Sequence, residues 1–428
     1  MEEGSGVMLD CLLAIQRDLP GQAERLRLQN RSVSRTEAEG ELTEVLLKFL
    51  GSRNVSSHIA ASLTQAAVQQ MLQGDLSALV KKNETQIKSE ENVKDEEEFL
   101  CTEQLFHSFL QCLEDVVSQW IKCPPLPPHP HQLCVSVHAI RNTRRKMEDR
   151  HVVLQDLNSL FGLKDGVERS YFAVFDGHGG VDAANYTATH LHVNVARHEK
   201  LASDPAQALR ESFQRTDDMF LLKAKRERLR SGTTGVCVLL DGVNLHVAWL
   251  GDSQALLVQQ GSHVTLMDPH KPERKDERER IESLGGCVAF MGCWRVNGTL
   301  AVSRAIGDID QKPFVSGKGD VTSHILSGTE DFVVLACDGF FDTISPSEVA
   351  GLVLGHLQES CGNWQHVAEK LVTAAKEGGS SDNITVLVVF LRQPQTLLDD
   401  FQAKGSNEGE PLFDFVGEGV EVASDHAG

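Results

Sequence analysis

Hydrophobic and polar residues follow two different periods along this chain. Up to residue 122, Leu, Ala, Val and Phe recur every three or four positions, as in residues 41–50, 58–80 and 103–121. This spacing predicts amphipathic helices. From Leu133 onward, short apolar runs alternate with turn signals such as Asp-Gly and Gly-Gly, which is typical of strands. We therefore expect an all-helical N-terminal region, residues 1–122, followed by a domain rich in strands.

Polar and proline-rich segments divide the chain further. The acidic stretch 88–98 predicts a solvated linker inside the N-terminal region, with a recognition segment as the alternative. Residues 123–132, CPPLPPHPHQ, predict an extended linker because successive prolines remove backbone donors. Beyond residue 393 the chain is polar and acidic, which predicts a disordered tail over 394–428. The main domain is thus expected to span residues 133–393.

Helical stretches interrupt the strands of this main domain in pairs. They are expected at residues 205–228, 275–284, 346–359 and 364–376. Strand clusters alternating with such pairs favour an α+β fold in which two packed antiparallel β-sheets are flanked by helices. The ends of the strands would then meet at one end of the sandwich, where a functional site can form.

Composition narrows the possible functions. The formal net charge of -20 disfavours broad binding to nucleic acid, which requires clustered Lys and Arg. No apolar run is long enough to cross a membrane, and the acidic start MEEGSGVMLD is unlike a signal peptide. The 10 cysteines contain no C-x-x-C pair, which favours a reducing, cytosolic setting. The phosphate-binding motif G-x-x-x-x-G-K-[ST] is also missing, which disfavours an ATP-driven motor or a kinase.

Four aspartates, Asp176, Asp252, Asp338 and Asp382, each lie at the edge of a short apolar run. A rigid strand therefore holds each carboxylate where it meets a loop. Carboxylates crowded together repel one another unless a cation neutralises them. Oxygen ligands alone suit Mg²⁺ or Mn²⁺ better than Zn²⁺. The sequence thus predicts metal-assisted chemistry at these four residues, with Asp342 as a further candidate acid.

Two motifs supply other candidate groups. Residues 141–151, RNTRRKMEDRH, place arginines and a lysine before Glu148, so this segment could address both a phosphate and a metal. In FDGHGG, Gly177 would let the backbone approach a cation, and His178 could donate a proton to a leaving oxygen. Taken alone, the first motif could equally be an ion-paired exposed strand, and the second a tight turn.

Other polar segments predict structure rather than chemistry. Residues 231–234, SGTT, are expected to form a polar turn. The basic run 223–230, KAKRERLR, is expected to be a solvated helix face, with a localisation signal or a polyanion site as alternatives. Residues 271–280 mix both charges and predict a salt-bridged helix start.

Eight motifs in order make the chain recognisable as a whole. They are RNTRRKMEDRH, FAVFDGHGG, SGTTGV, LGDS, DPHKP, NGTLAVSRAIGD, LACDGFFD and SSDNITV. This set, covering about residues 135–391, resembles the metal-dependent type 2C protein serine/threonine phosphatases. The resemblance implies the two-sheet sandwich, hydrolysis of phosphoserine and phosphothreonine on proteins, and a site for two Mg²⁺ or Mn²⁺ ions.

The resemblance also implies roles for individual residues. Asp176 would bridge the two ions, the Gly177 carbonyl would ligate one of them, and Asp338 and Asp382 would hold the other. Glu148 matches an acid that contacts a metal through water.

Three further positions match the family's pattern. Asp252 matches the site of a third, weaker ion, Arg144 a phosphate-binding arginine, and His178 the general acid. A metal-bridging hydroxide would then attack phosphorus directly, without a phosphoenzyme. Gln254 departs from the family, in which many members carry arginine, and this puts substrate or third-ion details in doubt.

The amino-acid sequences of residues 141–151 and 293–308 most resemble those of one subfamily, whose members dephosphorylate calmodulin-dependent kinases and bind PIX exchange factors. It implies kinase substrates, including small-GTPase-activated kinases, PIX exchange factors as partners, and a cytosolic location. Nucleic-acid and membrane partners are not expected. A catalytically silent scaffold with the same fold is the alternative, although silent members usually lose the metal acids that this chain keeps. A hydrolase of small phosphate esters is a third hypothesis.

Overall fold

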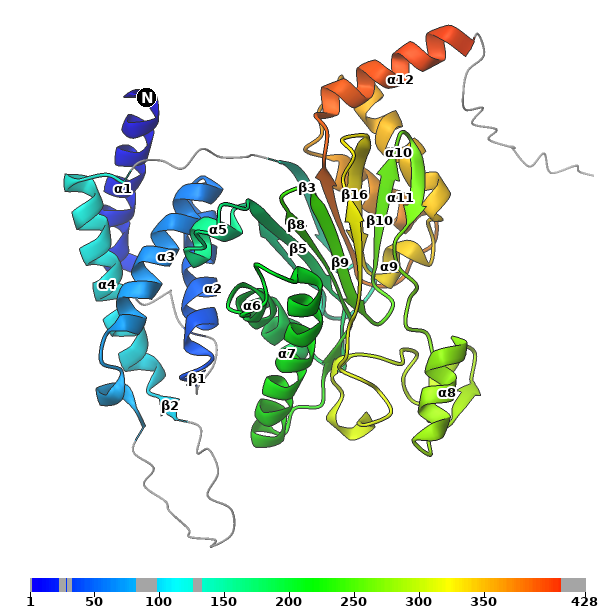
Figure 1. The fold of residues 1–428 in the computed structure, drawn as a ribbon, viewed down its shortest axis with the longest axis horizontal. Helices are drawn as coiled ribbons and strands as arrows, with labels where there is room; N and C mark the ends of the chain where they lie inside the picture. The colour runs from blue at the N-terminus through cyan, green and yellow to red at the C-terminus, as the bar shows by residue number, and fades with distance from the viewer. Residues whose placement is uncertain (1, 23–27, 29–32, 82–97, 126–132, 409–428) are drawn as a thin grey trace, which may run out of the picture.

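The computed structural model describes residues 2–22, 28, 33–81, 98–125 and 133–408 (Figure 1). Its main body is a sandwich of two antiparallel five-stranded sheets, which confirms the predicted fold. The first sheet has the order β11 (Ser262–Thr265), β10 (Gln254–Gln259), β16 (Glu330–Ala336), β17 (Ile384–Phe390) and β3 (Cys134–Ile140). The second has the order β15 (Asp320–Ile325), β9 (Asn244–Leu250), β8 (Gly235–Asp241), β5 (Arg169–Phe175) and β4 (Arg150–Leu154).

The central strands are buried on both faces. Every residue of β5, β8, β16 and β17 is buried, which explains why these strands read as continuous apolar runs instead of alternating patterns. One face of each sheet packs against the other sheet, with Phe172, Val238, Leu335 and Leu387 in the shared core. The opposite faces pack against helices.

Helices cover both outer faces of the sandwich. α6 (Asp182–Ala196) and α7 (Pro205–Glu227) lie on the second sheet, and α10 (Pro346–Glu359) and α11 (Val367–Glu377) lie on the first (Figure 1). Local signals start α7 and α10 at the predicted residues, whereas α11 begins three residues later than predicted and α6 was not predicted. The Asp204 carboxylate accepts the Gln207 amide at 3.0 Å ahead of α7, and Ser345 and Glu348 form a capping box at α10. Two short helices, α5 (Leu157–Phe161) and α9 (Asp338–Phe341), complete these layers.

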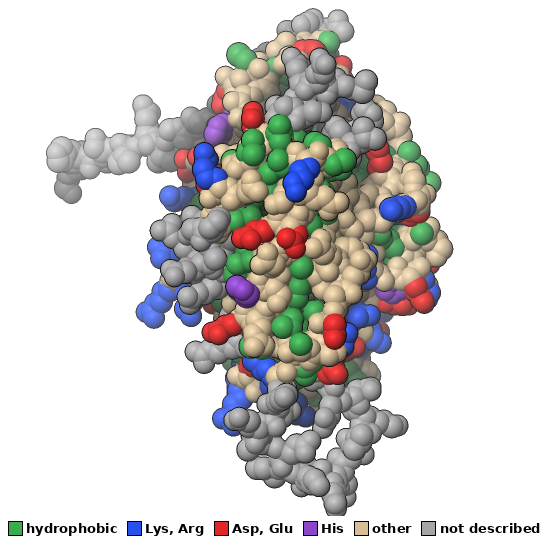
Figure 2. Space-filling view, turned by 90° about the vertical axis from the view of Figure 1, so that its left-hand side faces the viewer, with side chains coloured by type: hydrophobic (Ala, Val, Ile, Leu, Met, Phe, Trp, Pro, Cys, Tyr) green, Lys and Arg blue, Asp and Glu red, His purple; other side chains and the backbone are tan. Residues whose placement is uncertain are grey.

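The N-terminal region has its own core, formed by α1 (Glu2–Gln22), α2 (Ala38–Gly51), α3 (Ser57–Gln73) and α4 (Thr102–Lys122), with a 3₁₀ turn at Ser77–Leu79. The prediction of an all-helical region was wrong in one detail. β1 (Val33–Ser34) and β2 (Phe99–Leu100) form a small antiparallel sheet, because buried backbone here needs partners that no helix supplies. Figure 2 shows the molecule from the side of this region, where green hydrophobic side chains and scattered charged ones lie among tan atoms. None of the described helices is long and apolar enough to cross a membrane.

Three glutamates before and within the first turn of α2 attach the N-terminal region to the main domain. Glu37 accepts a hydrogen bond from the Tyr186 hydroxyl at 3.0 Å, and Glu39 pairs with Arg197 at 2.6 Å. Glu41 lies 3.3 Å from the His190 imidazole. The partners of all three belong to α6 or its C-terminal end, so α6 is held between the sheet and the N-terminal region.

The structure tests only part of the linker and tail predictions. The predicted disorder of 394–428 was wrong for residues 394–408, which form α12 (Pro394–Glu408). Leu397 and Leu398 are buried, and Arg392 pairs with Asp400, so apolar contacts hold this helix despite its polar composition. Residues 409–428, 126–132 and 88–97 lie outside the described residues, and the predictions for them stay untested.

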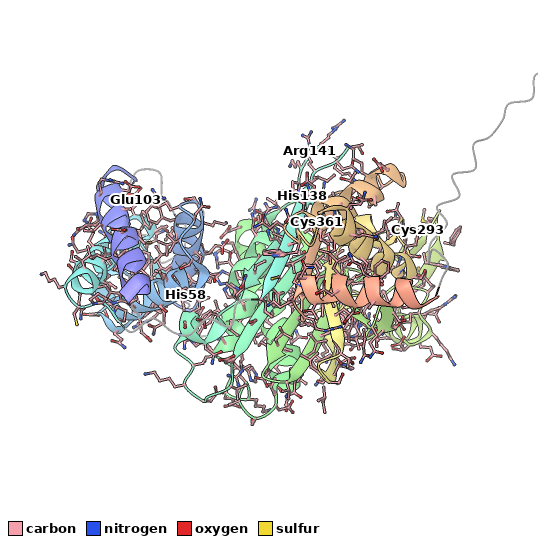
Figure 3. All side chains as sticks on the ribbon, turned by 90° about the horizontal axis from the view of Figure 1, so that it is seen from above. His58, Glu103, His138, Arg141, Cys293 and Cys361 are labelled. Atoms are coloured by element: carbon pink, nitrogen blue, oxygen red, sulfur yellow. The ribbon has the colours of Figure 1, made fainter. Side chains whose placement is uncertain are left out.

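A small subdomain, residues 271–318, extends from the sandwich between β11 and β15. We call it the α8 subdomain, after α8 (Lys275–Ser283), which packs on the hairpin β12 (Val288–Phe290) and β13 (Trp294–Val296). The salt-bridged helix start predicted here is present, with Arg274 paired to Asp276 at 2.8 Å. Figure 3 places Cys293 of this hairpin far from Glu103 of α4, at the opposite end of the molecule.

A buried carboxylate fixes the α8 subdomain internally. Glu277 accepts hydrogen bonds from Arg304 at 2.7 Å and from Arg280 at 2.8 Å, and Arg304 continues to Asp320 of β15 at 2.8 Å. Burial alone would raise the pKa of Glu277, but the hydrogen bonds from Arg304, Arg280 and Ser303 outweigh it and lower this pKa from 4.5 to about 2. The ion-paired network therefore stabilises the fold when Glu277 is ionised.

We predict that Tyr186→Phe lowers the free energy of unfolding by about 1.5–3 kcal/mol, because it leaves the buried Glu37 carboxylate without one of its donors. Urea unfolding at neutral pH measures this. Tyr171→Phe, at the chain's other tyrosine, is the matched control. The Tyr171 hydroxyl is buried beside the Cys237 thiol, a weak partner, so its loss should cost less. Equal losses would contradict a stabilising role for the Glu37 contact.

We also predict an acid-sensitive stability contribution from Glu277. Because its folded pKa is depressed, this contribution is present above pH 4.5 and is lost as the pH falls toward about 2. Glu277→Gln should therefore cost about 3 kcal/mol near pH 6, and less as the pH approaches 3. Urea unfolding at both pH values measures the difference. Glu282→Gln, on the exposed side of α8, should be nearly neutral at both. A pH-independent loss at Glu277 would overturn the linkage.

Candidate active site

Strand pairing brings the predicted acids to one end of the sandwich. Asp176 follows β5, Asp252 follows β9, and Asp338 follows β16 within two residues, whereas Asp382 precedes β17 by two residues. β5 and β9 both pair antiparallel with β8, so their C-terminal ends lie on the same side. β16 pairs antiparallel with β17, so the end of one strand meets the start of the other. Topology thus places the four carboxylates together.

A cavity of about 630 Å³ opens at this end. Eight of the nine residues that the sequence analysis named for metal, phosphate or proton chemistry line it: Arg144, Glu148, Asp176, Gly177, His178, Asp252, Asp338 and Asp382. The α8 subdomain contributes Arg295 and the apolar residues 300–302 to the lining, and Arg145, Lys146, Gly179, Thr234 and Asn383 complete it. Among the described residues, the N-terminal region contributes nothing to the lining.

Crowding of these acids disturbs their protonation. Burial, followed by the charges of Asp338 and Asp149, raises the pKa of Asp176 well above its usual value. Burial likewise raises the pKa of Asp338, and it raises the pKa of Asp252 to about 7, although Lys271 acts in the opposite direction. Carboxylates with raised pKa values are what like charges produce when no cation stands between them.

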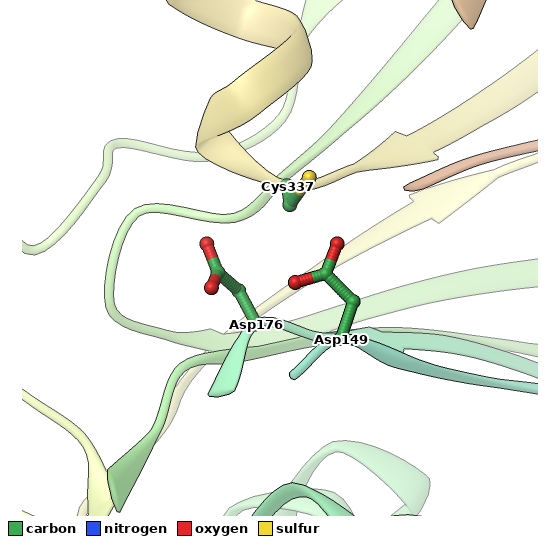
Figure 4. Close-up of side chains that lie close together, drawn as sticks. All are labelled: Asp149, Asp176 and Cys337. Carbon is green, nitrogen blue, oxygen red and sulfur yellow. The ribbon is translucent and has the colours of Figure 1, made fainter. Parts of the chain in front are cut away.

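A sixth acid, Asp149, lies beside the five acids that line the cavity. One oxygen of Asp149, one of Asp176 and the Cys337 sulfur lie within 4.8 Å of one another (Figure 4). Asp149 is 3% exposed, and burial raises its pKa to about 6. One of its oxygens accepts the Thr385 hydroxyl at 2.7 Å, and the other has no hydrogen-bond partner among the described residues. The sequence analysis gave Asp149 no role, although it directly follows Glu148.

These residues fit hard divalent cations. Their donors are carboxylate oxygens, and the unpartnered oxygen of Asp149 and the raised pKa of Asp176 are both relieved by positive charge nearby. Cys337 does not change this conclusion. Burial raises the pKa of its thiol well above the usual value, so it is protonated at neutral pH and unsuited to bind Mg²⁺ or Mn²⁺.

The basic loop before β4 is fastened to the loop before β17. The Asn383 side chain accepts the Glu148 amide at 2.8 Å and donates to the Lys146 carbonyl at 3.0 Å. Thr143 donates to the Ser381 carbonyl at 2.6 Å. Arg144, on the same loop, pairs with Asp382. Asn383 is therefore a structural clamp, a role that the sequence analysis did not assign to it.

The segment 231–234 is more than the polar turn that was predicted. Residues Gly232–Thr233 form β7, which pairs with β6 (Gly177–His178) and β14 (Ile306–Gly307). The Thr233 hydroxyl and the Thr234 amide both donate to the Asp176 carbonyl at 2.9 Å. The turn prediction failed because these donors act on a carbonyl far away in sequence, so nothing local marks them.

His178 lies at the rim of the cavity with Asp308 behind it. Its Nε2 is 2.8 Å from an Asp308 carboxylate oxygen. Burial would lower the pKa of His178, but the hydrogen bond and charge of Asp308, together with the charges of Asp252 and Glu148, raise it above its usual value. The sequence analysis gave Asp308 no role, because no local pattern links it to His178.

The structure places three further sets of predicted residues outside the cavity. Asp342 does not line the cavity. Its side chain is 62% exposed and lies 3.7 Å from Lys271. Gln254 begins β10 opposite Ala336 and is not among the lining residues either. The predicted solvated face at 223–230 holds for residues 225–228, whereas Lys223 is buried.

Comparison with known proteins agrees with this geometry. A family model described as protein phosphatase 2C matches residues 134–384. Human protein phosphatase 1F is 58% identical over 384 residues, covering 88% of this chain and 84% of the relative. Mouse protein phosphatase 1E is 50% identical over 88% of this chain and 50% of its own length.

The fold comparison is consistent with these sequences. A solved structure of a C. elegans sex-determining protein superposes with a TM-score of 0.71 at 23% identity, covering 92% of this chain and 96% of the other. At this identity the likeness shows the fold alone, and it extends over the N-terminal region as well as the sandwich. The predicted family is confirmed. The chain belongs to the protein phosphatase 2C family and is a metal-dependent protein serine/threonine phosphatase.

Proposed function

We propose that this phosphatase removes phosphate from serine and threonine residues of protein kinases, using two Mg²⁺ or Mn²⁺ ions and no phosphoenzyme. The observation that carries the proposal is the cavity itself, which joins buried carboxylates to a basic rim at Arg144, Arg145, Lys146 and Arg295. Carboxylates suit divalent cations, and guanidinium groups suit a phosphate oxygen pair. The cavity therefore matches a phosphate ester bound beside metal ions.

Each lining acid has a place in this scheme. Asp176, Asp338 and Asp382 would hold the two ions with the Gly177 carbonyl, and Glu148 would act through water. Asp252, which is 7% exposed, would hold a third and weaker ion. When bound, the ions would activate a water molecule for attack on phosphorus and neutralise charge on the phosphoryl oxygens.

The remaining groups handle the substrate. The Arg144 side chain is 58% exposed at the cavity rim, so it can leave Asp382 and orient the phosphoryl group. His178 would protonate the departing serine or threonine oxygen. The apolar stretch 300–302 would exclude water from one side of the bound ester.

The choice of kinases as substrates rests on the resemblance of residues 141–151 and 293–308 to one subfamily. The same resemblance supports PIX exchange factors as partners. We also propose a cytosolic location. All ten cysteines are free and several are exposed, which suits a reducing compartment.

We predict that Asp338→Ala lowers Mn²⁺-dependent phosphate release from a phosphothreonine kinase-loop peptide at least about a hundredfold, because the ion then loses a ligand. Release by the intact chain should resist okadaic acid and stop when a chelator is added. Asp342→Ala is the matched control, since it removes a carboxylate four residues away and outside the cavity. Titration calorimetry with Mn²⁺ should show weaker binding for Asp338→Ala alone.

Two results would contradict the proposal. A folded, Mn²⁺-loaded wild type without activity would favour the scaffold hypothesis. Faster turnover of small phosphate metabolites than of phosphoproteins would favour the small-ester hydrolase. Activity toward other phosphoproteins but not kinase peptides would remove only the kinase assignment.

A further inference from the structure

The geometry points to Asp308 as the positioning residue that holds the His178 imidazole for proton donation to the leaving oxygen. This inference rests on the proposed function, because His178 acts there as the proton donor. Asp308 lies 130 residues after His178 in the chain, and its carboxylate oxygen is 2.8 Å from Nε2. Asp308 is 6% exposed, whereas the His178 side chain is 29% exposed and faces the cavity.

The backbone at Asp308 is held in a conformation that few residues adopt. Its φ of 49° lies in the left-handed region, and Gly307 before it has a φ of 89°. Non-glycine residues enter this region only when their surroundings enforce it, and such residues gather at functional sites. Here the Asp308 amide donates to the Ser231 carbonyl at 3.2 Å, and the Gly307 amide donates to the buried Asp217 carboxylate at 2.8 Å.

A second device anchors the same turn. The Lys312 ammonium donates to Asp217 at 2.7 Å and to the Ala305 carbonyl at 3.0 Å. The second hydrogen bond closes the turn from residue 305 to residue 312, which contains Asp308. Asp217 is 2% exposed and is contributed by α7, a helix outside the cavity. Residues of α7 therefore fix the place of Asp308 without touching the substrate.

Because Gly232 has no side chain, it provides the space in which His178 and Asp308 come into contact. A Cβ atom at residue 232 would lie 2.1 Å from an Asp308 carboxylate oxygen and 2.4 Å from His178 Nε2. Any other residue would push the two side chains apart. β7, β6 and β14 thus form a small sheet that carries Gly232 between the histidine and the aspartate.

This arrangement determines which ring nitrogen is available. Nε2–H donates to Asp308, which leaves Nδ1, for which no hydrogen bond is found among the described residues. In the step itself, a water oxygen bonds to phosphorus and the bond from phosphorus to the serine or threonine oxygen breaks. That oxygen takes the proton from Nδ1, and the neutral imidazole regains one from the proton released by water. Asp308 keeps the ring oriented through this hydrogen bond.

Leaving-group dependence tests the inference. Asp308→Asn should lower kcat for a phosphothreonine peptide by about tenfold to a hundredfold, because a threonine alkoxide leaves poorly without a proton. It should change kcat for 4-nitrophenyl phosphate by less than about threefold, because nitrophenolate leaves unprotonated. Asp310→Asn, two residues away, with a 55% exposed side chain paired to Arg230, is the matched control and should leave both rates unchanged.

A double-mutant cycle separates positioning from a general structural effect. If Asp308 acts through the imidazole, His178→Gln with Asp308→Asn should be no slower than His178→Gln alone. Additive losses, or equal losses on both substrates, would overturn the inference. Unchanged rates in Asp308→Asn would overturn it while leaving the proposed function intact.

A spectroscopic readout remains valid without activity. In metal-free protein labelled with ¹⁵N-histidine, the signal lost in His178→Gln should report a protonated Nε2 in slow exchange with water. Asp308→Asn should shift that signal and speed its exchange, whereas Asp310→Asn should not. If Asp308→Asn changes neither the chemical shift nor the exchange rate of the His178 signal, the inference is overturned, even if the wild type hydrolyses neither substrate.

Discussion

Repulsion among buried carboxylates is the constraint on which the rest of this structure depends. Asp149, Asp176, Asp252 and Asp338 lie close enough, and deep enough, for each to have a raised pKa. A chain folds around such a cluster only if other contacts supply the free energy. The two packed sheets supply it, because every residue of their strands β5, β8, β16 and β17 is buried. The sandwich is thus a scaffold rigid enough to hold charges that prefer to separate, and divalent cations turn that unfavourable arrangement into a binding site.

Rigidity at the strand ends is extended into the loops by side chains that never reach the substrate. Asn383 ties the basic loop to the start of β17, and Thr233 and Thr234 fix the Asp176 carbonyl. The α8 subdomain follows the same rule, since the buried Glu277 holds Arg304 against β15 while residues 300–302 line the cavity. A metal ion and a phosphate require positions accurate to a fraction of an ångström. This supporting layer is what provides that accuracy.

The sequence predicted the fold and the lining acids because both depend on local patterns. Asp176 and Asp338 directly border apolar runs, and the runs themselves are the buried strands. Groups whose role depends on distant contacts were missed. Asp308 meets His178 across 130 residues, and Gly232 matters only because it lies between them. The pairing of β1 with β2 was missed because strands of two residues leave no period, and α12 because acidic composition outweighed Leu397 and Leu398.

The position of the N-terminal region limits how it can influence catalysis. Its described residues line no part of the cavity. They do hold α6, through Glu37, Glu39 and Glu41. α6 begins at Asp182, four residues after His178, and the Ala183 amide in its first turn donates to the Ser231 hydroxyl at 3.1 Å. These contacts give this region one direct connection to the site, through α6 to the two short strands that carry Gly177 and Gly232.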